Sequence, residues 1–487
     1  MTAGNIIADD GYETVIGLEV HVELATKTKI FCGCSTKFGA AVNTQVCPVC
    51  AGMPGTLPVL NRRVVDYAIA VGLALRCEIT RQSGFDRKNY FYPDNPQNYQ
   101  ISQLYAPVCQ NGRVEIDTAA GGTKAVGIHE IHMEEDAGKL IHDGAAGITY
   151  VDYNRAGVPL LEIVSEPDLR SAEEVIAYLE KLRMYIRYLG VSDCKMQEGS
   201  MRADVNLSVR PIGSTAYGTR TEMKNLNSYT AITHAIASER MRQIELLKAG
   251  ETVVQETRRF DEDRGVSYSM RSKEEAKDYR YFPEPDLPGL AISGEWIARI
   301  RSAQPEFRPE KMARYRKEYD IPEYDIAVLT ENRALAEIFE ETAALCGQPK
   351  KAANWLMGET LRLLKEQEME PEEICFSPAH LAALIGLVER KVINATAAKE
   401  VFAVMFAKDV DPVEYVEEKG LQQEQDAGAV RQVCEQVLKD NPQSVADYLG
   451  GKDRALGFLV GQAMKASKGK ADPGMVNRLL KELLQAK

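Results

Sequence analysis

Hydrophobic and polar positions change their spacing along the chain, and the change separates three regions. Residues 1–292 carry short β-rich runs between Gly, Pro and Asn turns, which predicts an α+β domain built on antiparallel sheet. Two helices interrupt this pattern, at about residues 171–190 and 228–248. The first is the better marked, because Ser171 and Glu174 have capping-box spacing and the apolar residues after them recur at helical intervals.

A segment rich in proline, residues 282–289, marks the expected end of this first domain, since it can continue neither a helix nor a central strand. Segments rich in Ala, Leu, Glu and Lys with helical spacing follow, and they predict an all-α domain over residues 293–410. A break at Asp411 and Pro412 then introduces a smaller helical tail domain, residues 411–487.

Four cysteines lie close together in the first domain as a Cys-x-Cys pair and a Cys-x-x-Cys pair, with twelve residues between the pairs. Two short pairs of thiolates on opposing turns are the pattern that a tetrahedral zinc site requires. Because all four ligands are cysteines, no position is open for a catalytic water, and we expect a structural zinc knuckle at residues 32–50. The alternative is four reduced thiols without a metal. The four predicted ligands are Cys32, Cys34, Cys47 and Cys50.

A short pattern occurs twice, as LEVHVE at residues 18–23 and as HEIHME at residues 129–134. Alternate residues of a strand share one face, so each copy presents two carboxylates and an imidazole on one side. If both strands border one pocket, these groups suit Mg²⁺ or Mn²⁺, and such an ion could hold the phosphates of ATP. The alternative is the solvated polar face of a half-buried sheet. The residues concerned are Glu19, His21, Glu23, Glu130, His132 and Glu134.

Further acids and bases follow in strand-like or turn-rich surroundings. The alternation of apolar residues after position 204 places Asp204 and Asn206 on the opposite, polar face of a strand. Alternation alone does not distinguish a site from a solvated sheet surface, but nearly every polar strand face in residues 15–230 carries such side chains. The additional candidates are Glu162, Lys195, Glu198, Arg202, Asp204 and Asn206.

The composition is that of a globular protein, and we expect it to be cytoplasmic. Hydrophobic residues make up 45% of the 487 residues and charged residues 27%, and no apolar run of ~18 residues is present to span a bilayer. The N-terminal sequence has no basic start and no apolar secretion segment, so the ten cysteines are expected to be thiols or metal ligands. A net charge of -12 argues against nucleic-acid binding along the whole surface.

The end of the tail domain differs from the rest of this acidic chain, because basic residues cluster there among glycines. Such a patch is a candidate contact with an RNA backbone. The alternative is the solvated surface of a small helical bundle. The basic residues are Lys452, Arg454, Lys465, Lys468, Lys470 and Arg478.

Two common nucleotide-binding motifs are absent from the sequence, the GxxxxGK[ST] phosphate loop and a GxGxxG turn after a strand. Any nucleotide must therefore be held without them. A Gly/Ser-rich amidase stretch and a Cys nucleophile elbow are missing as well, so the chain gives no sign of releasing ammonia from glutamine itself.

Several segments, in order along the chain, are long enough to be compared with known families. They are IGLEVHVEL at 16–24, KNYFYPDNPQ at 88–97, HMEEDAGK at 132–139, LLEIVSEPD at 160–168, MRADVN at 201–206, EMKNLN at 222–227 and DYRYFPEPD at 278–286. These segments closely resemble the family formed by the B subunits of aspartyl/glutamyl-tRNA(Asn/Gln) amidotransferases. A looser resemblance continues through the helical and tail domains.

The resemblance implies a cradle-shaped catalytic domain similar to the glutamine synthetase core, followed by a helical domain and a tail like that of the YqeY-type proteins. It also implies a three-subunit enzyme, in which an amidase (A) subunit frees ammonia from glutamine and a small C subunit ties the two together. Ammonia would reach the cradle through an internal channel. The helical and tail domains would hold the misacylated tRNA.

The activity that the resemblance implies is that of a carbon–nitrogen ligase with glutamine as the amide donor. ATP would phosphorylate the side-chain carboxylate of Glu-tRNA(Gln) or Asp-tRNA(Asn), and ammonia would then give Gln-tRNA(Gln) or Asn-tRNA(Asn). Two other functions fit some of the same residues. One is a non-catalytic, zinc-containing scaffold that binds tRNA, and the other is a metal-dependent hydrolase or nuclease that needs neither ATP nor a partner.

The metal and nucleotide site of the family maps onto Glu19, His21 and Glu134, with Glu162 beside them. These residues are therefore expected to hold Mg²⁺ and to take part in catalysis with ATP. Since some members of the family lack the four cysteines, zinc is expected to brace the loop after the first strand and to take no part in the chemistry.

The resemblance also suggests which side chains contact the reacting groups. Lys195, Arg202 and Lys224 are candidates for contacts with the phosphates or the acyl phosphate. Asp204 is a candidate for orienting the metal or ammonia.

Overall fold

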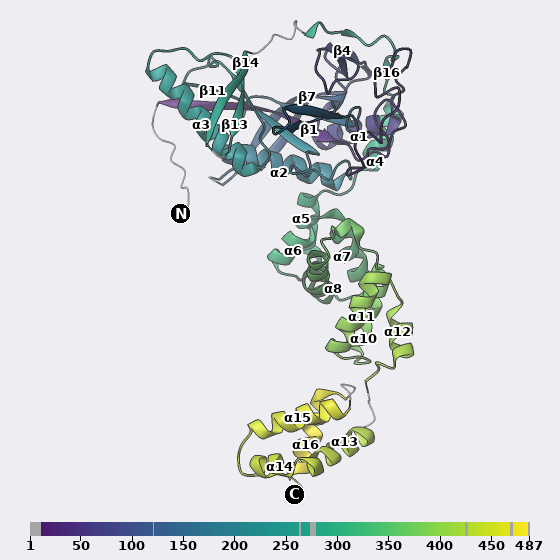
Figure 1. Ribbon diagram of the computed structural model, residues 1–487. Coiled ribbons are helices and arrows are strands. Elements are labelled where there is room, and N and C mark those ends of the chain that lie inside the picture. The colour runs from purple at the N-terminus through teal and green to yellow at the C-terminus, as the bar shows by residue number, and fades with distance from the viewer. Residues whose placement is uncertain are drawn as a thin grey trace. The chain divides into compact units, whose positions relative to one another are not determined.

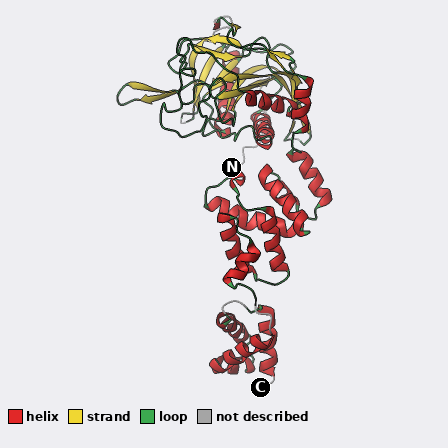
Figure 2. Ribbon diagram, turned by 90° about the vertical axis from the view of Figure 1, so that its right-hand side faces the viewer, coloured by secondary structure: helices red, strands yellow, loops and turns green. Residues whose placement is uncertain are grey.

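The structure is a computed structural model that describes residues 11–119, 121–262, 264–272, 279–423, 427–467 and 471–485. The chain divides into two compact units, Met1–Phe307 and Arg308–Lys487 (Figure 1). Among the described residues the strands lie in the first unit, whereas the second is helical (Figure 2). The predicted combination of a sheet-containing part and a helical part is thereby confirmed.

A large, mostly antiparallel sheet forms the centre of the first unit. Its described strands run in the order β14-β13-β12-β11-β1-β10-β7-β6-β2. Only the β12–β13 pair among them is parallel. The strands are β1 (Tyr12–Glu23), β2 (Glu78–Ile79), β6 (Cys109–Asp117), β7 (Thr123–Glu135), β10 (Pro159–Ser165), β11 (Met201–Pro211), β12 (Thr221–Lys224), β13 (Glu256–Asp261) and β14 (Val266–Ser272).

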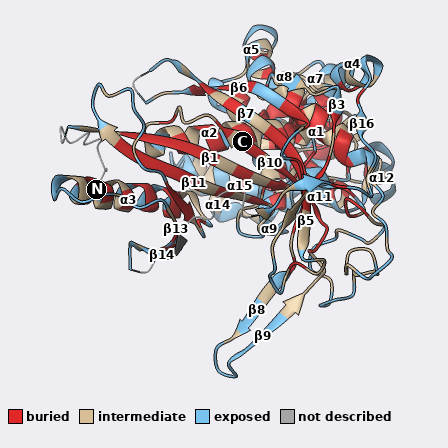
Figure 3. Cartoon of the chain, turned by 90° about the horizontal axis from the view of Figure 1, so that it is seen from above, coloured by how far each residue is buried: buried red, intermediate tan, exposed pale blue. Residues whose placement is uncertain are grey.

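Three small sheets accompany the large one. β4 (Asp86–Asn89) lies between β5 (Tyr99–Ser102) and β15 (Phe282–Pro283), and β3 (Gln82–Ser83) pairs with β16 (Leu290–Ala291). β8 (Lys139–Asp143) and β9 (Ile148–Asp152) form a hairpin that extends away from the sheet and is largely exposed (Figure 3).

Helices cover one face of the large sheet and leave the other face to polar side chains. Along β1, Leu18, Val20 and Val22 are buried in the hydrophobic core, while the residues between them point to the other side. The same core takes in α1 (Arg62–Ala74), α2 (Ala172–Tyr188) and α3 (Tyr229–Lys248). Figure 1 shows α2 and α3 along one side of the sheet.

Both predicted helices of this unit are present, and the serine expected at the start of the first one caps it. The Ser171 side chain accepts a hydrogen bond from the backbone N–H of Glu174 at the start of α2, and Ser228 caps α3 in the same way. Gly190 follows α2 with a φ of 65°, a left-handed conformation that glycine adopts at little cost.

The first unit continues beyond the boundary expected at residue 292. α4 (Gly294–Ser302) packs against α1, where the Trp296 Nε1–H donates to Asp66 at 2.6 Å. Ile300 of α4 is part of the same hydrophobic core. The unit therefore ends at Phe307, because the helix after the proline-rich segment is still held by the sheet domain.

The described helices of the second unit enclose two separate hydrophobic clusters. Val416 of α12 belongs to the first cluster, so the division between the clusters falls after α12 and not at the expected position 411. The helices are α5 (Arg308–Glu318), α6 (Glu323–Leu329), α7 (Arg333–Cys346), α8 (Pro349–Trp355), η2 (Leu356–Thr360), α9 (Leu361–Glu366), η3 (Pro371–Glu373), α10 (Pro378–Glu389), α11 (Ala395–Lys408), α12 (Pro412–Lys419), α13 (Ala427–Asp440), α14 (Pro442–Leu449), α15 (Arg454–Ala466) and α16 (Pro473–Gln485). None of the described helices combines the length and apolar character needed to cross a membrane.

Candidate functional site

The register of the large sheet brings the predicted polar residues together on the face that the helices do not cover. β1 lies between β10 and β11, and His21 is paired with Glu162 on one side and with Arg202 on the other. Glu19, two residues earlier, is opposite Asp204. Directly paired residues of an antiparallel sheet share a face, so these side chains gather in one place.

A first group of possible metal ligands consists of His21, Glu134 and Glu162. The Nε2 atom of His21 lies 3.2 Å from Oε2 of Glu162 and 3.7 Å from Oε1 of Glu134. One ligand atom from each of the three lies within 4.8 Å of the others. Carboxylate oxygens and an imidazole nitrogen at this spacing could hold a divalent cation.

The repeated LEVHVE and HEIHME segments lie on two strands, β1 and β7, that flank β10. Glu162 on the middle strand contacts an imidazole from each side, because its Oε2 is also 3.0 Å from Nε2 of His132. His132 is only 8% exposed and Glu134 only 3%. These residues thus form a buried cluster, and the solvated sheet face considered as the alternative does not describe them.

The close contacts shift the protonation of the first group. Burial by itself lowers the pKa of His21, but the nearby carboxylates, Glu162 foremost, together outweigh it and raise that pKa to about 9. Burial raises the pKa of Glu162, yet the His132 and His21 rings hold it well below its usual range. The cluster therefore favours a carboxylate between positively charged rings, and a cation that binds there has to displace protons.

A second group of possible ligands consists of Glu19, Asp204 and Glu222, whose carboxylate oxygens also lie within 4.8 Å of one another. The structure groups Glu19 with these two carboxylates, whereas the single ion expected at Glu19, His21 and Glu134 stays a prediction. The Asn206 Nδ2 donates to Oε1 of Glu19 at 2.9 Å. Burial and the nearby carboxylates, Glu162 foremost, raise the pKa of Glu19.

Lys224 supplies the positive charge of this second group. Its ammonium forms ion pairs with Asp204 and, at 3.3 Å, with Glu222. Burial would lower the pKa of Lys224, but the Asp204 and Glu222 carboxylates raise it above its ordinary value. The predicted phosphate contact Lys224 is therefore at the site and is charged.

The other two predicted phosphate contacts lie in different places. Arg202 is on the polar face, where its Nη2 is 2.7 Å from Oδ2 of Asp136. Arg155 reaches the same carboxylate at 3.4 Å, so two guanidinium groups meet at Asp136. Lys195 lies outside both carboxylate groups, in the turn before β11, where its ammonium is 3.2 Å from Glu198.

Two residues of the site have no sequence pattern that marks them as functional. Glu222 and Lys88 stand inside two of the motifs, but nothing in their spacing distinguishes them from surface charges. Burial lowers the pKa of Lys88, whereas Tyr281 and the carboxylates of the first group raise it above its ordinary value. The Lys88 ammonium also lies 5.1 Å from the centre of the Tyr279 ring.

The cysteine cluster is assembled as the spacing predicts. The Cys50 sulfur is 4.0 Å from that of Cys34 and 3.9 Å from that of Cys47, and all four sulfurs lie within 4.8 Å of one another. A tetrahedral zinc with Zn–S bonds of about 2.3 Å would place its sulfurs about 3.8 Å apart. The cluster could therefore hold a metal such as zinc without a large rearrangement.

The predicted basic residues of the tail are exposed where the structure describes them. Lys452 precedes α15 and is 3.0 Å from Asp447, and Arg454 and Lys465 lie at the two ends of α15. Arg478 lies on α16. The other two predicted positions, Lys468 and Lys470, are outside the described residues.

The fold and the site together define a class of protein. It is a mixed α/β protein whose sheet has one face covered by helices and one face with two groups of residues that could hold divalent cations. Comparison with known proteins shows which family this mixed α/β protein belongs to. Residues 14–298 match the family described as the GatB/GatE catalytic domain, and residues 337–484 match the family described as the GatB domain.

Curated relatives resemble the chain over nearly its whole length. The B subunit of the aspartyl/glutamyl-tRNA(Asn/Gln) amidotransferase of Agathobacter rectalis is 65% identical over 473 residues, which cover 97% of this chain and 99% of the relative. The protein of the same name from Lachnospira eligens is 65% identical over 480 residues, and that from Caldicellulosiruptor saccharolyticus is 56% identical over 477, with the same coverage. The chain belongs to the family of B subunits of aspartyl/glutamyl-tRNA(Asn/Gln) amidotransferases.

Proposed function

We propose that this chain activates the side-chain carboxylate of Glu or Asp misattached to tRNA, at the expense of ATP, and transfers the activated group to ammonia. The observation that carries this proposal is that one sheet face has two sets of three residues, His21, Glu134 and Glu162 and then Glu19, Asp204 and Glu222, whose ligand atoms are close enough together for a divalent cation. Such an arrangement suits a phosphoryl transfer, where charge on the moving group has to be neutralised.

The reaction consists of two displacements. An oxygen of the substrate carboxylate attacks the γ-phosphorus of ATP, the bond to the bridging oxygen breaks, and ADP leaves. Ammonia then attacks the carbonyl carbon of the acyl phosphate and loses a proton. Inorganic phosphate departs with one oxygen of the former carboxylate, and the amide remains on the tRNA.

His21, Glu134 and Glu162 would hold one Mg²⁺, and Glu19, Asp204 and Glu222 a second. When bound, these ions would offset the negative charge of the ATP phosphates and of the transferring phosphoryl group. The chain's own residues orient the ligands: the Asn206 amide fixes one oxygen of Glu19 at 2.9 Å, and the Ser102 hydroxyl donates to Glu134 at 3.3 Å.

Positive side chains around the two groups would bind the phosphates. Lys224 and Arg202 are both paired with carboxylates on the polar face, so each can exchange an internal partner for a phosphate oxygen. Lys88 is a further basic side chain near the first group. Lys195, in the turn before β11, remains a candidate for a more peripheral contact.

The remaining parts of the proposal concern partners. Ammonia comes from an amidase (A) subunit, a small C subunit joins the two, and the misacylated tRNA contacts the basic residues of the tail. The cysteine cluster would bind a structural zinc ion.

We also propose that the sheet domain adopts the cradle shape and resembles the glutamine synthetase core, and that the complex works in the cytoplasm.

The decisive assay uses the chain co-expressed with its amidase and small partner. ATP cleavage and amidation are measured with Glu-tRNA(Gln) and with Asp-tRNA(Asn), for the wild type and for Glu19→Ala. We expect Glu19→Ala to abolish tRNA-dependent ATP cleavage while the glutaminase activity of the partner survives. Glu115→Ala, which removes an exposed carboxylate from β6, is the matched control.

Retained ATP cleavage in Glu19→Ala would refute the assignment of the site. ATP cleavage that does not depend on misacylated tRNA in the wild type would refute the proposed substrate. A non-catalytic scaffold would cleave no ATP in either protein.

A further inference from the structure

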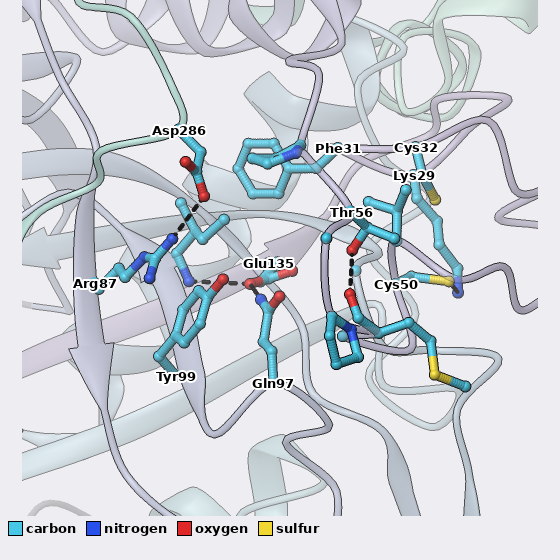
Figure 4. A pocket seen from close by; sticks show the side chains of 18 residues that line it. Lys29, Phe31, Cys32, Cys50, Thr56, Arg87, Gln97, Tyr99, Glu135 and Asp286 are labelled. Carbon is cyan, nitrogen blue, oxygen red and sulfur yellow. Dashed lines mark hydrogen bonds and ion pairs between the residues drawn. The ribbon is translucent and has the colours of Figure 1, made fainter.

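Lys29 is buried beneath the cysteine cluster. Its side chain is 0% exposed, and its ammonium donates to the Gln45 carbonyl at 2.8 Å, to the Tyr153 carbonyl at 3.3 Å and to the Cys50 sulfur at 3.4 Å. Figure 4 shows the Lys29 amine next to the Cys50 sulfur, in the lining of a pocket that also contains Glu135. An ammonium in this position has exchanged all its water for three protein contacts.

A buried ammonium needs a compensating negative charge, because carbonyl dipoles alone do not replace its hydration. In the part of the chain that the structure describes, no carboxylate lies within 4.0 Å of the Lys29 ammonium. The nearest anionic candidate is the Cys50 sulfur. A Zn²⁺ ion with four thiolate ligands has a net charge of about -2. One ammonium next to this site reduces the net charge to about -1.

We propose that Lys29 is the counter-charge of the cysteine site and determines how tightly that site holds zinc. This inference rests on the proposed zinc site and goes beyond it, because it makes a residue outside the ligand set responsible for metal retention. An N–H···S bond to Cys50 also orients that sulfur, as groups outside the ligand set commonly do at metal sites.

The same lysine joins the cysteine cluster to the catalytic face. The segment it contacts through Tyr153 continues to Gly157, whose carbonyl accepts from the Ile30 N–H at 3.0 Å and whose N–H donates to the Asp136 carbonyl at 2.9 Å. Asp136 is the carboxylate that holds Arg202. Lys29 thus contacts a segment that is itself hydrogen-bonded to the backbone of Asp136.

The test uses the full-length chain co-expressed with its partners and compares Lys29→Met with the wild type. Zinc per chain is measured by elemental analysis, and the rate of zinc loss to a chelating dye is followed by absorbance. We expect Lys29→Met to lose zinc about 10 to 100 times faster, the usual effect of removing a group that supports a metal ligand. Lys29→Arg, which keeps the charge, should release zinc more slowly than Lys29→Met. Lys27→Met, which alters an exposed lysine two residues away, should match the wild type.

A spectroscopic measurement reports on the thiolates directly. The Co²⁺-substituted protein has thiolate-to-metal absorption bands, and these should shift in Lys29→Met and remain unchanged in Lys27→Met. If Lys29→Met does not fold, Lys29→Gln carries the same test, since it keeps hydrogen-bond donors but lacks the charge.

Each outcome decides the matter. Equal zinc release by the wild type and the uncharged variant would overturn the role of Lys29 while leaving the zinc site intact. Zinc release from Lys29→Arg as fast as from Lys29→Met would overturn it as well. A wild type without zinc would overturn both the zinc site and this inference, whereas amidation activity, assayed separately, would leave the proposed function standing.

Discussion

His21 on β1 and Glu162 on β10 face each other across the sheet, with 3.2 Å between Nε2 and Oε2. His132 reaches the same Glu162 oxygen from the opposite strand at 3.0 Å. Glu162 therefore links the two strands that carry the repeated His/Glu pattern, and it is central to the first candidate cation group.

Replacing Glu162 by Gln tests whether the negative charge of this side chain is needed for cation binding. The amide has nearly the same volume but no negative charge, so it cannot serve as an anionic ligand. We expect Mn²⁺ affinity, measured by electron paramagnetic resonance, to fall by more than about 100-fold, since removing even supporting groups costs about 10 to 100-fold. Glu130→Gln is the matched control, because Glu130 lies 3.6 Å from His132 but outside the cation group. Unchanged Mn²⁺ affinity in Glu162→Gln would exclude it as a ligand.

Removing the Lys224 charge should have two opposite effects. The ammonium competes with a divalent cation for Asp204 and Glu222, and a charge at about 4 Å is worth roughly 1 to 4 kcal/mol at the effective dielectric constants of protein surfaces. Lys224→Met should therefore bind Mn²⁺ about 10-fold more tightly and yet cleave ATP more slowly, because the variant has no ammonium to bind a phosphate oxygen. Lys248→Met, which alters an exposed lysine at the end of α3, provides the comparison. Weaker Mn²⁺ binding by Lys224→Met would show that the lysine supports the cation and does not compete with it.

Loss of the zinc site should lower the thermal stability of the chain, because the zinc ion is expected to have a structural role only. Cys47→Ser removes one of four ligands, and a structural site contributes directly to folding free energy. We expect zinc content to fall below half an equivalent and the thermal unfolding temperature of the chain to drop by several degrees. Cys375→Ser, which alters an exposed cysteine of the second unit, should change neither value. Full zinc content in Cys47→Ser would contradict the assigned ligand set.

The tail residues should contribute to tRNA affinity by binding phosphates. Neutralising Lys452, Arg454, Lys465 and Arg478 together should weaken tRNA binding. It should also lower the slope of log K against log salt by about 1 for each phosphate that is no longer paired with a basic side chain. Lys365→Ala, an exposed change on α9, should leave the slope unchanged. Reduced affinity with an unchanged salt slope would indicate a loss of tail folding, and would contradict a role in phosphate binding.

The alternation of residues on β1 and β7 was enough to predict which side chains share a face, because that depends only on the period of a strand. The strand order was not predictable in the same way. Glu162 completes the first group because β10 lies between β1 and β7, and β1 is more than a hundred residues away from β10 along the chain. The alternation of residues within β1 or β7 does not show that β10 lies between these two strands.

Two residues show a further limit of sequence reasoning. Lys29 follows the polar run Thr26–Lys27–Thr28 and has the sequence context of a surface lysine, yet the cysteine loop buries it completely. Glu19 was grouped with His21 because both share one face of β1. Its side chain joins Asp204 and Glu222 because β11 and β12, on the other side of β1, bring those carboxylates nearer.

The most direct test of carboxylate activation follows the oxygen atoms. Misacylated tRNA carrying ¹⁸O in both side-chain carboxylate oxygens is incubated with ATP, ammonia and the complete enzyme, and the released inorganic phosphate is analysed by mass spectrometry. We expect one ¹⁸O atom in each phosphate formed with an amide, because the carboxylate oxygen that attacked ATP leaves with the phosphoryl group. Phosphate without ¹⁸O, released as amide accumulates, would contradict carboxylate activation by ATP.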